Sequence, residues 1–391
     1  MTSKWLKRLA LMLALCMTVG LTACNREGEE SSSEASSGTS DVDEQPRKVG
    51  YIFHGSGDNG SFSAEMNVQR VKASNRSSMD TCYIDNVSIS DFESAVKQLI
   101  SVGCTEIVSG CAIYANTLSS LSSKYMNINF ISYGALSGPA NVSAYTELTY
   151  QGAYAAGMAA AFNSNARKIG FVGDMDMAYT VPSVNAAALG MQAVFTSATL
   201  YAATATRDNE IEDAIDALID KGCDVIICYT GSSHSEDYCQ RKGIKFIGSH
   251  DYKDRESDYS NMLMYYCARR DSYFLAEFKQ MQFDTWIPGT YVGDVGNSVI
   301  HISEALPAAD SKQGDTQKLL NALVPKLTSG NVYIFSGELK DNTGTIKYIH
   351  TDIMSDSEIF DMDWFVEGVE SAGDFRELLT DLPPNSFEVK S

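Results

Sequence analysis

The glycine-rich segment at residues 55–60 carries the clearest chemical pattern in this sequence, since GSGDNG fits G-x-G-x-x-G. In a dinucleotide-binding enzyme, such glycines let the backbone approach a pyrophosphate. An acidic residue further along the chain, here Asp85, would bind the ribose. Asp58 opposes this interpretation, because a carboxylate inside the loop would repel a pyrophosphate. A plain strand–turn–helix junction without a ligand is a further alternative, because glycines are common in turns. We therefore expect no cofactor.

The same segment can form the rim of a binding cleft. In open α/β sheets, ligands settle outside the carboxyl ends of the strands, where backbone N–H groups, carboxylates and aromatic faces converge. The segment lies at such an end, between an expected strand and an expected helix. We therefore expect Asp58, Asn59, Ser61 and Phe62 to face a ligand.

Three histidines, His54, His234 and His250, each follow the end of an expected strand, which would direct them into the same cleft. A single histidine is more often a surface residue or a satisfied polar group, so both interpretations stay open. Tyrosines near these strand ends could supply aromatic walls, although a tyrosine in a strand usually only packs. They are Tyr229, Tyr252, Tyr265 and Tyr266.

The cysteines do not form a metal-binding pattern. There is no C-x-x-C pair, and the grouping of Cys228, His234 and Cys239 lacks a repeated ligand spacing, so we expect no metal site. Seven cysteines other than Cys16 and Cys24 lie in the rest of the chain, an odd number. Buried free thiols are the default for such residues, and one disulfide stays open as an alternative.

Motif and charge patterns favour binding of a small molecule over catalysis or nucleic-acid binding. The sequence contains no nucleophile elbow, H-E-x-x-H helix or P-loop, so we expect that the protein is not an enzyme. The formal charge is −20, and no basic stripe is present. Because phosphate backbones are bound by such stripes, we expect no nucleic-acid partner.

The elements that must position these residues alternate between short β-rich runs and helix-length amphipathic segments. In the first half, strands are expected at 48–53, 81–84, 106–109, 129–133 and 141–145, with helices at 61–74, 90–102 and 115–125. Ser90 and Glu93 fit a capping box for the second of these helices. The pattern then restarts at a helix expected over 150–162 and continues to residue 328. Such alternation predicts βαβ units around parallel sheets.

We therefore expect an α/β fold of two doubly wound, Rossmann-like lobes joined by hinge crossovers, over residues 48–375. The first lobe is expected to comprise about 48–145 plus 268–302, and the second about 146–267 plus 303–370. Residues 376–391 are expected to form a C-terminal tail.

The pattern of the N-terminal residues predicts an export signal followed by a lipid-attachment site. Lys4, Lys7 and Arg8 precede an apolar stretch at 9–21 that is too short for an ordinary membrane span. The following LTAC resembles the bacterial lipobox, with Cys24 as the lipidated residue. We expect a signal peptide at 1–23 and a disordered Ser/Glu-rich tether at 24–47, which has too few apolar residues to fold.

Several segments together resemble one family. They are the loop ending in Ser61-Phe62, YQGAYAAGMAA at 150–160, KIGFVG at 168–173, DVII at 224–227, FIG at 246–248, GTY at 289–291 and MDWFVEGV at 362–369. In order and spacing they resemble the basic membrane protein family, nucleoside-binding lipoproteins with the type I periplasmic-binding fold. The resemblance covers most of residues 48–370.

The resemblance implies a purine-type base stacked on aromatic rings and a ribose held by an aspartate and a lysine. Phe62 matches the stacking aromatic, and Asp58, Asn59 and Ser63 match the polar loop. The chain departs from the family pattern in three places. The loop is about one residue shorter, Phe53 and His54 displace the family's leading aspartate, and Ser63 replaces the usual asparagine. A glycine-rich turn spans Tyr229 to His234, the aspartate falls at His250 or Asp251, and the lysine falls near Ala268 and Arg269.

The expected function is that of a lipid-anchored solute-binding protein of an ABC importer. The expected ligand is a nucleoside or similar heterocycle, the expected partner is the ABC permease, and the chain is expected to be a monomer on the extracytoplasmic face of the cell membrane. One alternative is a lipoprotein sensor that presents its ligand to a membrane receptor. Another is a secreted Rossmann-type oxidoreductase, although export would separate it from cytoplasmic NAD.

Overall fold

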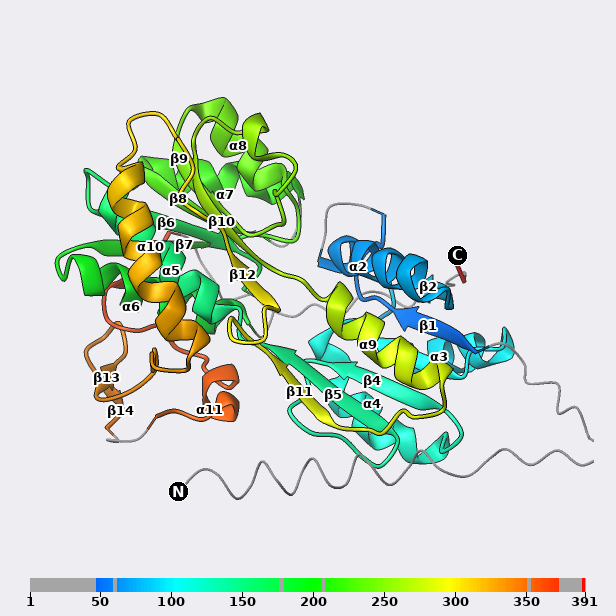
Figure 1. The fold of residues 1–391 in the computed structure, drawn as a ribbon. Coiled ribbons are helices and arrows are strands. Elements are labelled where there is room, and N and C mark those ends of the chain that lie inside the picture. The colour runs from blue at the N-terminus through cyan, green and yellow to red at the C-terminus, as the bar shows by residue number, and fades with distance from the viewer. Residues whose placement is uncertain are drawn as a thin grey trace, which may run out of the picture. The chain divides into compact units, whose positions relative to one another are not determined.

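The fold was described from a computed structural model of the chain (Figure 1). The structure describes residues 47–58, 62–175, 179–205, 208–349, 353–372 and 389–390. The expected signal peptide, Cys24, almost all of the expected tether and Asn59 lie outside the described residues.

The first sheet is parallel throughout and has the order β11-β5-β4-β3-β1-β2. Its strands are β1 (Lys48–Ile52), β2 (Asp80–Ile84), β3 (Glu106–Ser109), β4 (Asn129–Tyr133), β5 (Val142–Glu147) and β11 (Thr290–Gly293). Its helices are α2 (Phe62–Ser77), α3 (Phe92–Ser101), α4 (Ala115–Leu121) and α9 (Asp271–Gln282).

The second sheet has the order β12-β10-β9-β8-β6-β7-β15, and β12 is antiparallel to β10. Its strands are β6 (Lys168–Gly173), β7 (Thr199–Thr204), β8 (Val225–Tyr229), β9 (Lys245–Gly248), β10 (Met262–Ala268), β12 (Ile300–Ile302) and β15 (Val369–Ser371). The accompanying helices are α5 (Tyr150–Asn163), α6 (Thr180–Val194), α7 (Asp208–Asp220), α8 (His234–Lys242) and α10 (Gln313–Thr328).

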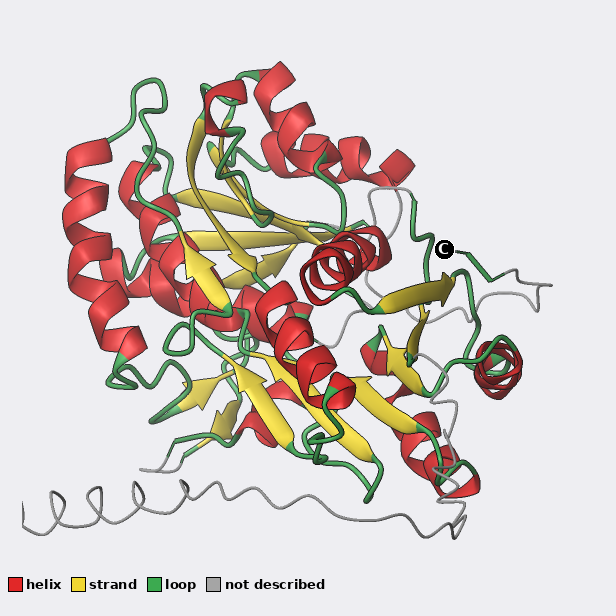
Figure 2. Ribbon diagram, turned by 45° about the vertical axis from the view of Figure 1, so that its right-hand side comes forward, coloured by secondary structure: helices red, strands yellow, loops and turns green. Residues whose placement is uncertain are grey.

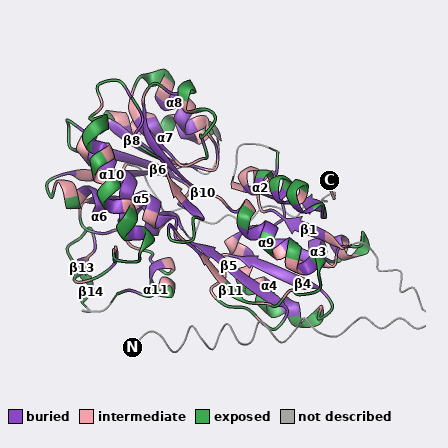
Figure 3. Ribbon diagram, in the orientation of Figure 1, coloured by how far each residue is buried: buried purple, intermediate pink, exposed green. Residues whose placement is uncertain are grey.

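Each sheet is covered on both faces, as a parallel sheet requires. Along β1, Val49 and Tyr51 pack with α2 and α9, whereas Ile52 packs with α3 and α4. The alternation arises because successive side chains of a strand point to opposite faces. Figures 2 and 3 show helices around the sheets and buried residues concentrated in the central strands. The predicted fold class is therefore confirmed.

Two helices of the second lobe are in unusually close contact. A Cβ placed on Gly157 of α5 would lie 1.9 Å from the Ala187 carbonyl oxygen of α6. A Cβ on Gly190 of α6 would lie 2.1 Å from the Tyr154 carbonyl oxygen of α5. Only glycine fits at either position, so the backbones of α5 and α6 meet directly.

The chain passes between the sheets after β5, after β10 and between β11 and β12, as Figure 1 shows. The last crossing ends earlier than the sequence indicated. Residues 300–302 pair with β10, so they belong to the second sheet, whereas the sequence pattern predicts 268–302 in the first lobe. The reason is that Ser298 adopts positive φ in a turn that redirects the chain after β11.

Local predictions differ from the structure at helix ends and near the C-terminus. The expected capping box of Ser90 and Glu93 is wrong, because α3 begins at Phe92 and Asp91 is its N-cap. The Ser88 hydroxyl instead donates to Asp91 at 2.9 Å, which shapes the turn before the helix. Four late elements were not predicted: β13 (Leu339–Lys340), β14 (Ile346–Tyr348), α11 (Asp356–Phe360) and β15 (Val369–Ser371). Within the described ranges, no helix is both long and apolar enough to cross a bilayer.

Candidate ligand-binding site

The centre of the candidate site is Arg270, the N-cap of α9, which follows the crossing after β10. Its side chain is only 4% exposed. Its Nη2 donates to Glu147 Oε2 at 2.8 Å, and its Nη1 donates to Glu65 Oε1 at 2.8 Å. Burial alone would lower the pKa of Arg270, but Glu147 and Glu65 raise it well above its usual range. The guanidinium is therefore a fixed charge.

Glu147 ends β5 and is fully buried. It also accepts hydrogen bonds from the Tyr145 hydroxyl at 2.5 Å and the Tyr133 hydroxyl at 3.3 Å. A buried carboxylate is tolerated only when it is paired and hydrogen-bonded, and Glu147 meets both conditions. Because Glu65 also pairs with Arg270, this cluster of one cation and two carboxylates carries a net negative charge.

Aromatic rings surround the Arg270 cluster. The Arg270 guanidinium carbon lies 4.9 Å from the Phe62 ring centroid and 5.9 Å from that of Tyr133. Phe62 and Tyr133 are 5.3 Å apart, and Tyr133 and Tyr179 are 5.6 Å apart. Tyr179 caps α6 in the second lobe, so these rings come from both lobes. Flat apolar faces and a cation suit a ligand with a planar ring.

Tyr229 ends β8 and continues this aromatic surface into the second lobe. Its ring is nearly parallel to that of Tyr266, with an interplanar angle of 11° and centroids 6.1 Å apart. Its hydroxyl donates to Thr149 Oγ1 at 3.0 Å. Burial raises the pKa of the Tyr229 phenol, which keeps the hydroxyl neutral.

His250 is the most unusual polar residue near the cluster. Its Nδ1 lies 3.1 Å from Oε1 of Glu236, a fully buried carboxylate in the first turn of α8. Burial would lower the pKa of His250, but Glu236 and, more weakly, Glu65 raise it to about 9. Its Nε2 is buried and makes no hydrogen bond of standard geometry to a described residue, although the Gly231 backbone also raises the pKa of the ring. A protonated donor without such a bond normally meets an acceptor from a ligand or water.

The described part of the glycine-rich loop is held from the edge of the first sheet. Tyr83 donates to Asp58 Oδ1 at 2.8 Å, and Lys390 Nζ lies 3.3 Å from Asp58 Oδ2. These two partners lower the pKa of Asp58. Asp85 accepts from the Gly57 backbone N–H at 3.1 Å and pairs with Lys390 at 2.9 Å. Asp85 therefore fixes the loop backbone, in contrast to the ribose-gripping role weighed for it above.

The other predicted site residues have local partners. The Ser63 hydroxyl is buried and accepts from the Gly55 N–H at 3.0 Å, which shapes the loop. His54 Nδ1 lies 3.0 Å from the Val87 carbonyl oxygen, and His234 Nε2 lies 3.1 Å from Glu212. Asp251 is exposed and pairs with Arg269 at 3.4 Å. Phe62, Tyr229 and His250 are thus the predicted residues that gather with the Arg270 cluster.

Sequence reasoning missed Arg270, Glu65, Glu147 and Glu236. The resemblance placed a cation near Ala268 and Arg269, one residue short of Arg270. A glutamate at the end of a fully buried strand was the available signal for Glu147, because a carboxylate there needs a buried cation. Within the described ranges, no three His, Cys, Asp or Glu side chains are placed to hold a metal ion. The seven cysteines are buried free thiols.

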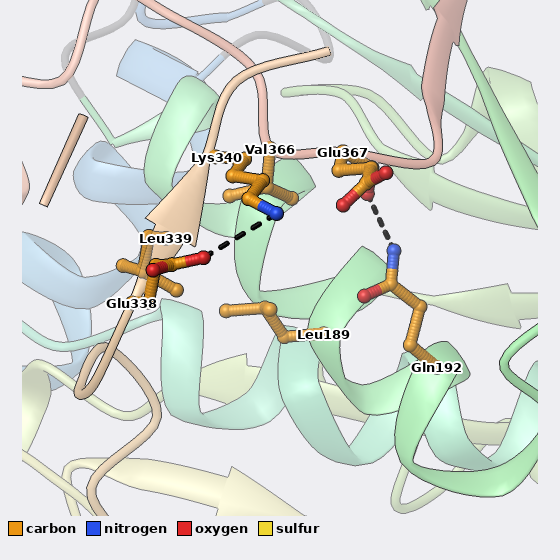
Figure 4. A pocket seen from close by; sticks show the side chains of 7 residues that line it. All are labelled: Leu189, Gln192, Glu338, Leu339, Lys340, Val366 and Glu367. Atoms are coloured by element: carbon orange, nitrogen blue, oxygen red, sulfur yellow. Dashed lines mark hydrogen bonds and ion pairs between the residues drawn. The ribbon is translucent and has the colours of Figure 1, made fainter. Parts of the chain in front are cut away.

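A small cavity of about 190 Å³ lies elsewhere, between α6 and β13, lined by Leu189, Gln192, Lys340 and Glu367 among others (Figure 4). Ligand pockets usually exceed 300 Å³, so this cavity does not suit a nucleoside.

Comparisons with known proteins agree with this architecture. Residues 47–236 match the Bmp family, described as PnrA-like ABC transporter substrate-binding proteins. A purine-binding protein of Brucella abortus (strain 2308) is 22% identical over 333 residues, which are 84% of this chain and 94% of that protein.

Solved structures show the fold. A solute-binding protein of an ABC transporter system from Aeropyrum pernix K1 matches with a TM-score of 0.63 at 16% identity, covering 76% of this chain and 93% of that one. A corresponding protein from Conexibacter woesei matches with a TM-score of 0.58 at 18% identity, covering 73% and 97%. A transcriptional activator of the comK gene from Bacillus halodurans matches with a TM-score of 0.59 at 17% identity, covering 72% and 98%.

The protein therefore has the two-lobed α/β architecture of the type I periplasmic-binding fold. More particularly, residues 47–236 match the Bmp family of PnrA-like ABC transporter substrate-binding proteins, as the resemblance implied. Because this is a family of binding proteins, the chain is not an enzyme, and the oxidoreductase alternative falls away.

Proposed function

We propose that this chain is a lipid-anchored, extracytoplasmic substrate-binding protein that captures a purine nucleoside and delivers it to the permease of an ABC importer. The observation that carries the proposal is the gathering of Phe62, Tyr133, Tyr179 and Tyr229 around Arg270. These residues come from both lobes, so one ligand that touches them all would favour closure.

The chemistry of the cluster fits the two halves of a nucleoside. Aromatic faces suit a purine base, because stacking on a ring is worth about 1–3 kcal/mol per base in nucleic-acid complexes. Carboxylates and a protonated histidine suit ribose hydroxyls, which both donate and accept hydrogen bonds. The purine-binding relative from Brucella abortus supports the same ligand class.

Within the predicted site residues, we propose that Phe62, Tyr229 and His250 contact the ligand together with Arg270. Asp58, Asn59 and Ser63 would form the rim of the cleft, with Ser63 shaping the loop backbone through Gly55. We propose that His54, His234 and Asp251 are peripheral. His54 contacts the Val87 carbonyl, and His234 pairs with the partly exposed Glu212. The exposed Asp251 pairs with Arg269.

The ligand can be identified directly. Protein purified gently should release a purine nucleoside that mass spectrometry detects, and isothermal titration calorimetry with adenosine, guanosine and inosine should give saturable binding. Release of an unrelated solute, with no heat from any nucleoside, would contradict the ligand assignment. Permease and ATPase genes beside this gene would favour uptake over sensing.

The lipid anchor has its own test. Cells expressing the Cys24→Ser variant should incorporate no labelled fatty acid into the protein, because serine cannot form the thioether. The Cys16→Ser variant is the matched control and should stay labelled. Label on the Cys24→Ser protein would exclude Cys24 as the anchor.

A further inference from the structure

A second cavity, of about 500 Å³, lies beside the crossing that carries Arg270. It is lined by α2 of the first lobe, by the loop after β9 of the second lobe, and by the two residues that flank Arg270. Its volume is within the usual range of small-molecule sites. Its lining includes six charged residues: Lys72, Arg76, Asp251, Lys253, Arg269 and Asp271.

The lining carries more positive than negative charge. Asp271 pairs with Arg76 at 2.6 Å, and Asp251 pairs with Arg269 at 3.4 Å. Both carboxylates are therefore matched by arginines, and Lys72 and Lys253 add two further positive charges. A local excess of cations is unexpected in a chain whose formal charge is −20.

The pKa of His301, a residue of β12 near Arg269 and Lys253, reflects the same positive potential. Burial lowers the pKa of His301, and the positive charges of Arg269 and Lys253 lower it further. Asp251 opposes this effect without reversing it. The imidazole therefore lies where cations outweigh the neighbouring carboxylate.

The two lysines belong to different lobes. Lys72 lies on α2, which packs on the first sheet, and Lys253 follows β9 of the second sheet. Closure of the lobes would bring these like charges together, which costs free energy. An anion held between them would remove the repulsion, and arginines at its edges suit the oxygens of a phosphate group.

We propose that this cavity binds an oxyanion of the phosphate class, and that the bound anion favours closure of the lobes around the nucleoside. The coupling to nucleoside binding rests on the proposed function, whereas the anion site does not. The phosphate group can come from free inorganic phosphate or from the phosphate ester of a nucleotide.

Calorimetry with inorganic phosphate, against chloride at matched ionic strength, tests the site. Phosphate should bind saturably, and it should tighten adenosine binding about fivefold, a typical size for coupling between two sites. The Lys72→Gln and Lys253→Gln variants should lose phosphate binding and this enhancement. The Lys97→Gln variant, which changes an exposed lysine of α3 outside the cavity, should keep both.

Adenosine 5′-monophosphate distinguishes the two sources. If the phosphate belongs to the ligand, the nucleotide should bind more tightly than adenosine, and inorganic phosphate should compete with it. If the phosphate is free, the nucleotide should bind no more tightly than adenosine. The first result supports the anion site directly, and the second supports it when inorganic phosphate itself binds saturably.

The inference is overturned if phosphate gives no saturable heat, or if Lys97→Gln weakens phosphate binding as much as the two cavity variants. Normal adenosine binding with no effect of phosphate would overturn the inference and leave the proposed function intact. Saturable phosphate binding with no response to any nucleoside would contradict the proposed function and leave the anion site intact.

Discussion

Two histidine–glutamate pairs in the second lobe have the same separation and different surroundings. In both pairs a ring nitrogen lies 3.1 Å from a glutamate oxygen: His250 with Glu236, and His234 with Glu212. The side chains of the first pair are 15% and 0% exposed, whereas those of the second are 34% and 43% exposed. Glu212 also pairs with Arg241, and Glu236 accepts from Ser235 and the Ser249 N–H. The comparison teaches that burial, more than the position of a histidine after a strand, distinguishes a candidate ligand-binding residue.

Removal of each glutamate should separate the pairs most strongly. Glu236→Gln leaves a buried imidazolium without its counterion, which should lower the free energy of unfolding by about 3–5 kcal/mol. Glu212→Gln breaks an exposed pair and should cost less than about 1 kcal/mol. Urea unfolding measures both. Equal losses would mean that the His250 pair is effectively solvated.

The buried pair should also make stability depend on pH. The folded pKa of His250, about 9, is above its ordinary value of 6.5, so the folded state holds the proton more tightly. The resulting stabilisation, up to about 3 kcal/mol, should be complete below pH 6.5 and lost as the pH rises through 9. Urea unfolding between pH 6 and 10 should show this loss in the native chain but not in His250→Gln. A loss of the same size in both proteins would assign it to other groups.

Ligand affinity should respond to one histidine only. His250→Gln removes a charged donor whose Nε2 makes no hydrogen bond of standard geometry to a described residue, so nucleoside affinity should fall about tenfold to hundredfold. His234→Gln is the matched control and should leave Kd unchanged. Calorimetry measures both variants. Equal affinities of the His250→Gln and His234→Gln variants would contradict the assignment of His250 to the ligand site.

Phe62 extends the comparison from polar groups to the aromatic surface. Phe62→Ala should weaken nucleoside binding by one to two orders of magnitude, because a stacking face is lost. Phe283, which is 71% exposed on the first lobe, provides the control Phe283→Ala, with no change in affinity. If Phe62 were only a core residue, its truncation would instead cost about 3–5 kcal/mol of stability with affinity unchanged.

Lys390 should give the smallest effect. Lys390→Met removes two ion pairs, one with the exposed Asp58 and one with the buried Asp85. Because the Lys390 side chain is itself 37% exposed, the loss of stability should be about 1 kcal/mol. Nucleoside affinity should fall by a few fold, since the loop rim is less well held. Thermal melts and calorimetry check both quantities, and a melt shift without an affinity change would separate the loop from the ligand.

The parts of the fold that follow from local pattern were predictable from sequence. The run VIICY at Val225–Tyr229 is apolar throughout, as a strand buried on both faces must be, and β3 and β4 were predicted at their observed bounds. The capping box at Ser90 was wrong, because α3 begins at Phe92 and so has Asp91, not Ser90, at its N-cap position. The three-residue strand β12 was placed on the wrong side of the crossing, because its pairing depends on a turn and not on its own pattern.

The centre of the site could not be predicted in the same way. Glu147 and Arg270 are 123 residues apart, and no spacing rule brings them together. His250 and His234 look alike in sequence, since each follows a strand, and only tertiary packing buries one of them. Phe62, which lies against Arg270, could be singled out as a candidate because it comes just after a recognisable glycine-rich loop.

The contact made by Lys390 also bears on how the protein is handled. Its backbone N–H and C=O both bond to Tyr83 at 2.7 Å, and thereby cover part of β2, the edge strand of the first sheet. Uncovered edges invite pairing with strands of other molecules. Versions of the protein shortened at residue 372 for crystallisation or for biosensor fusions should therefore aggregate or dimerise more readily, and retaining residues 389–390 should keep the preparation monodisperse.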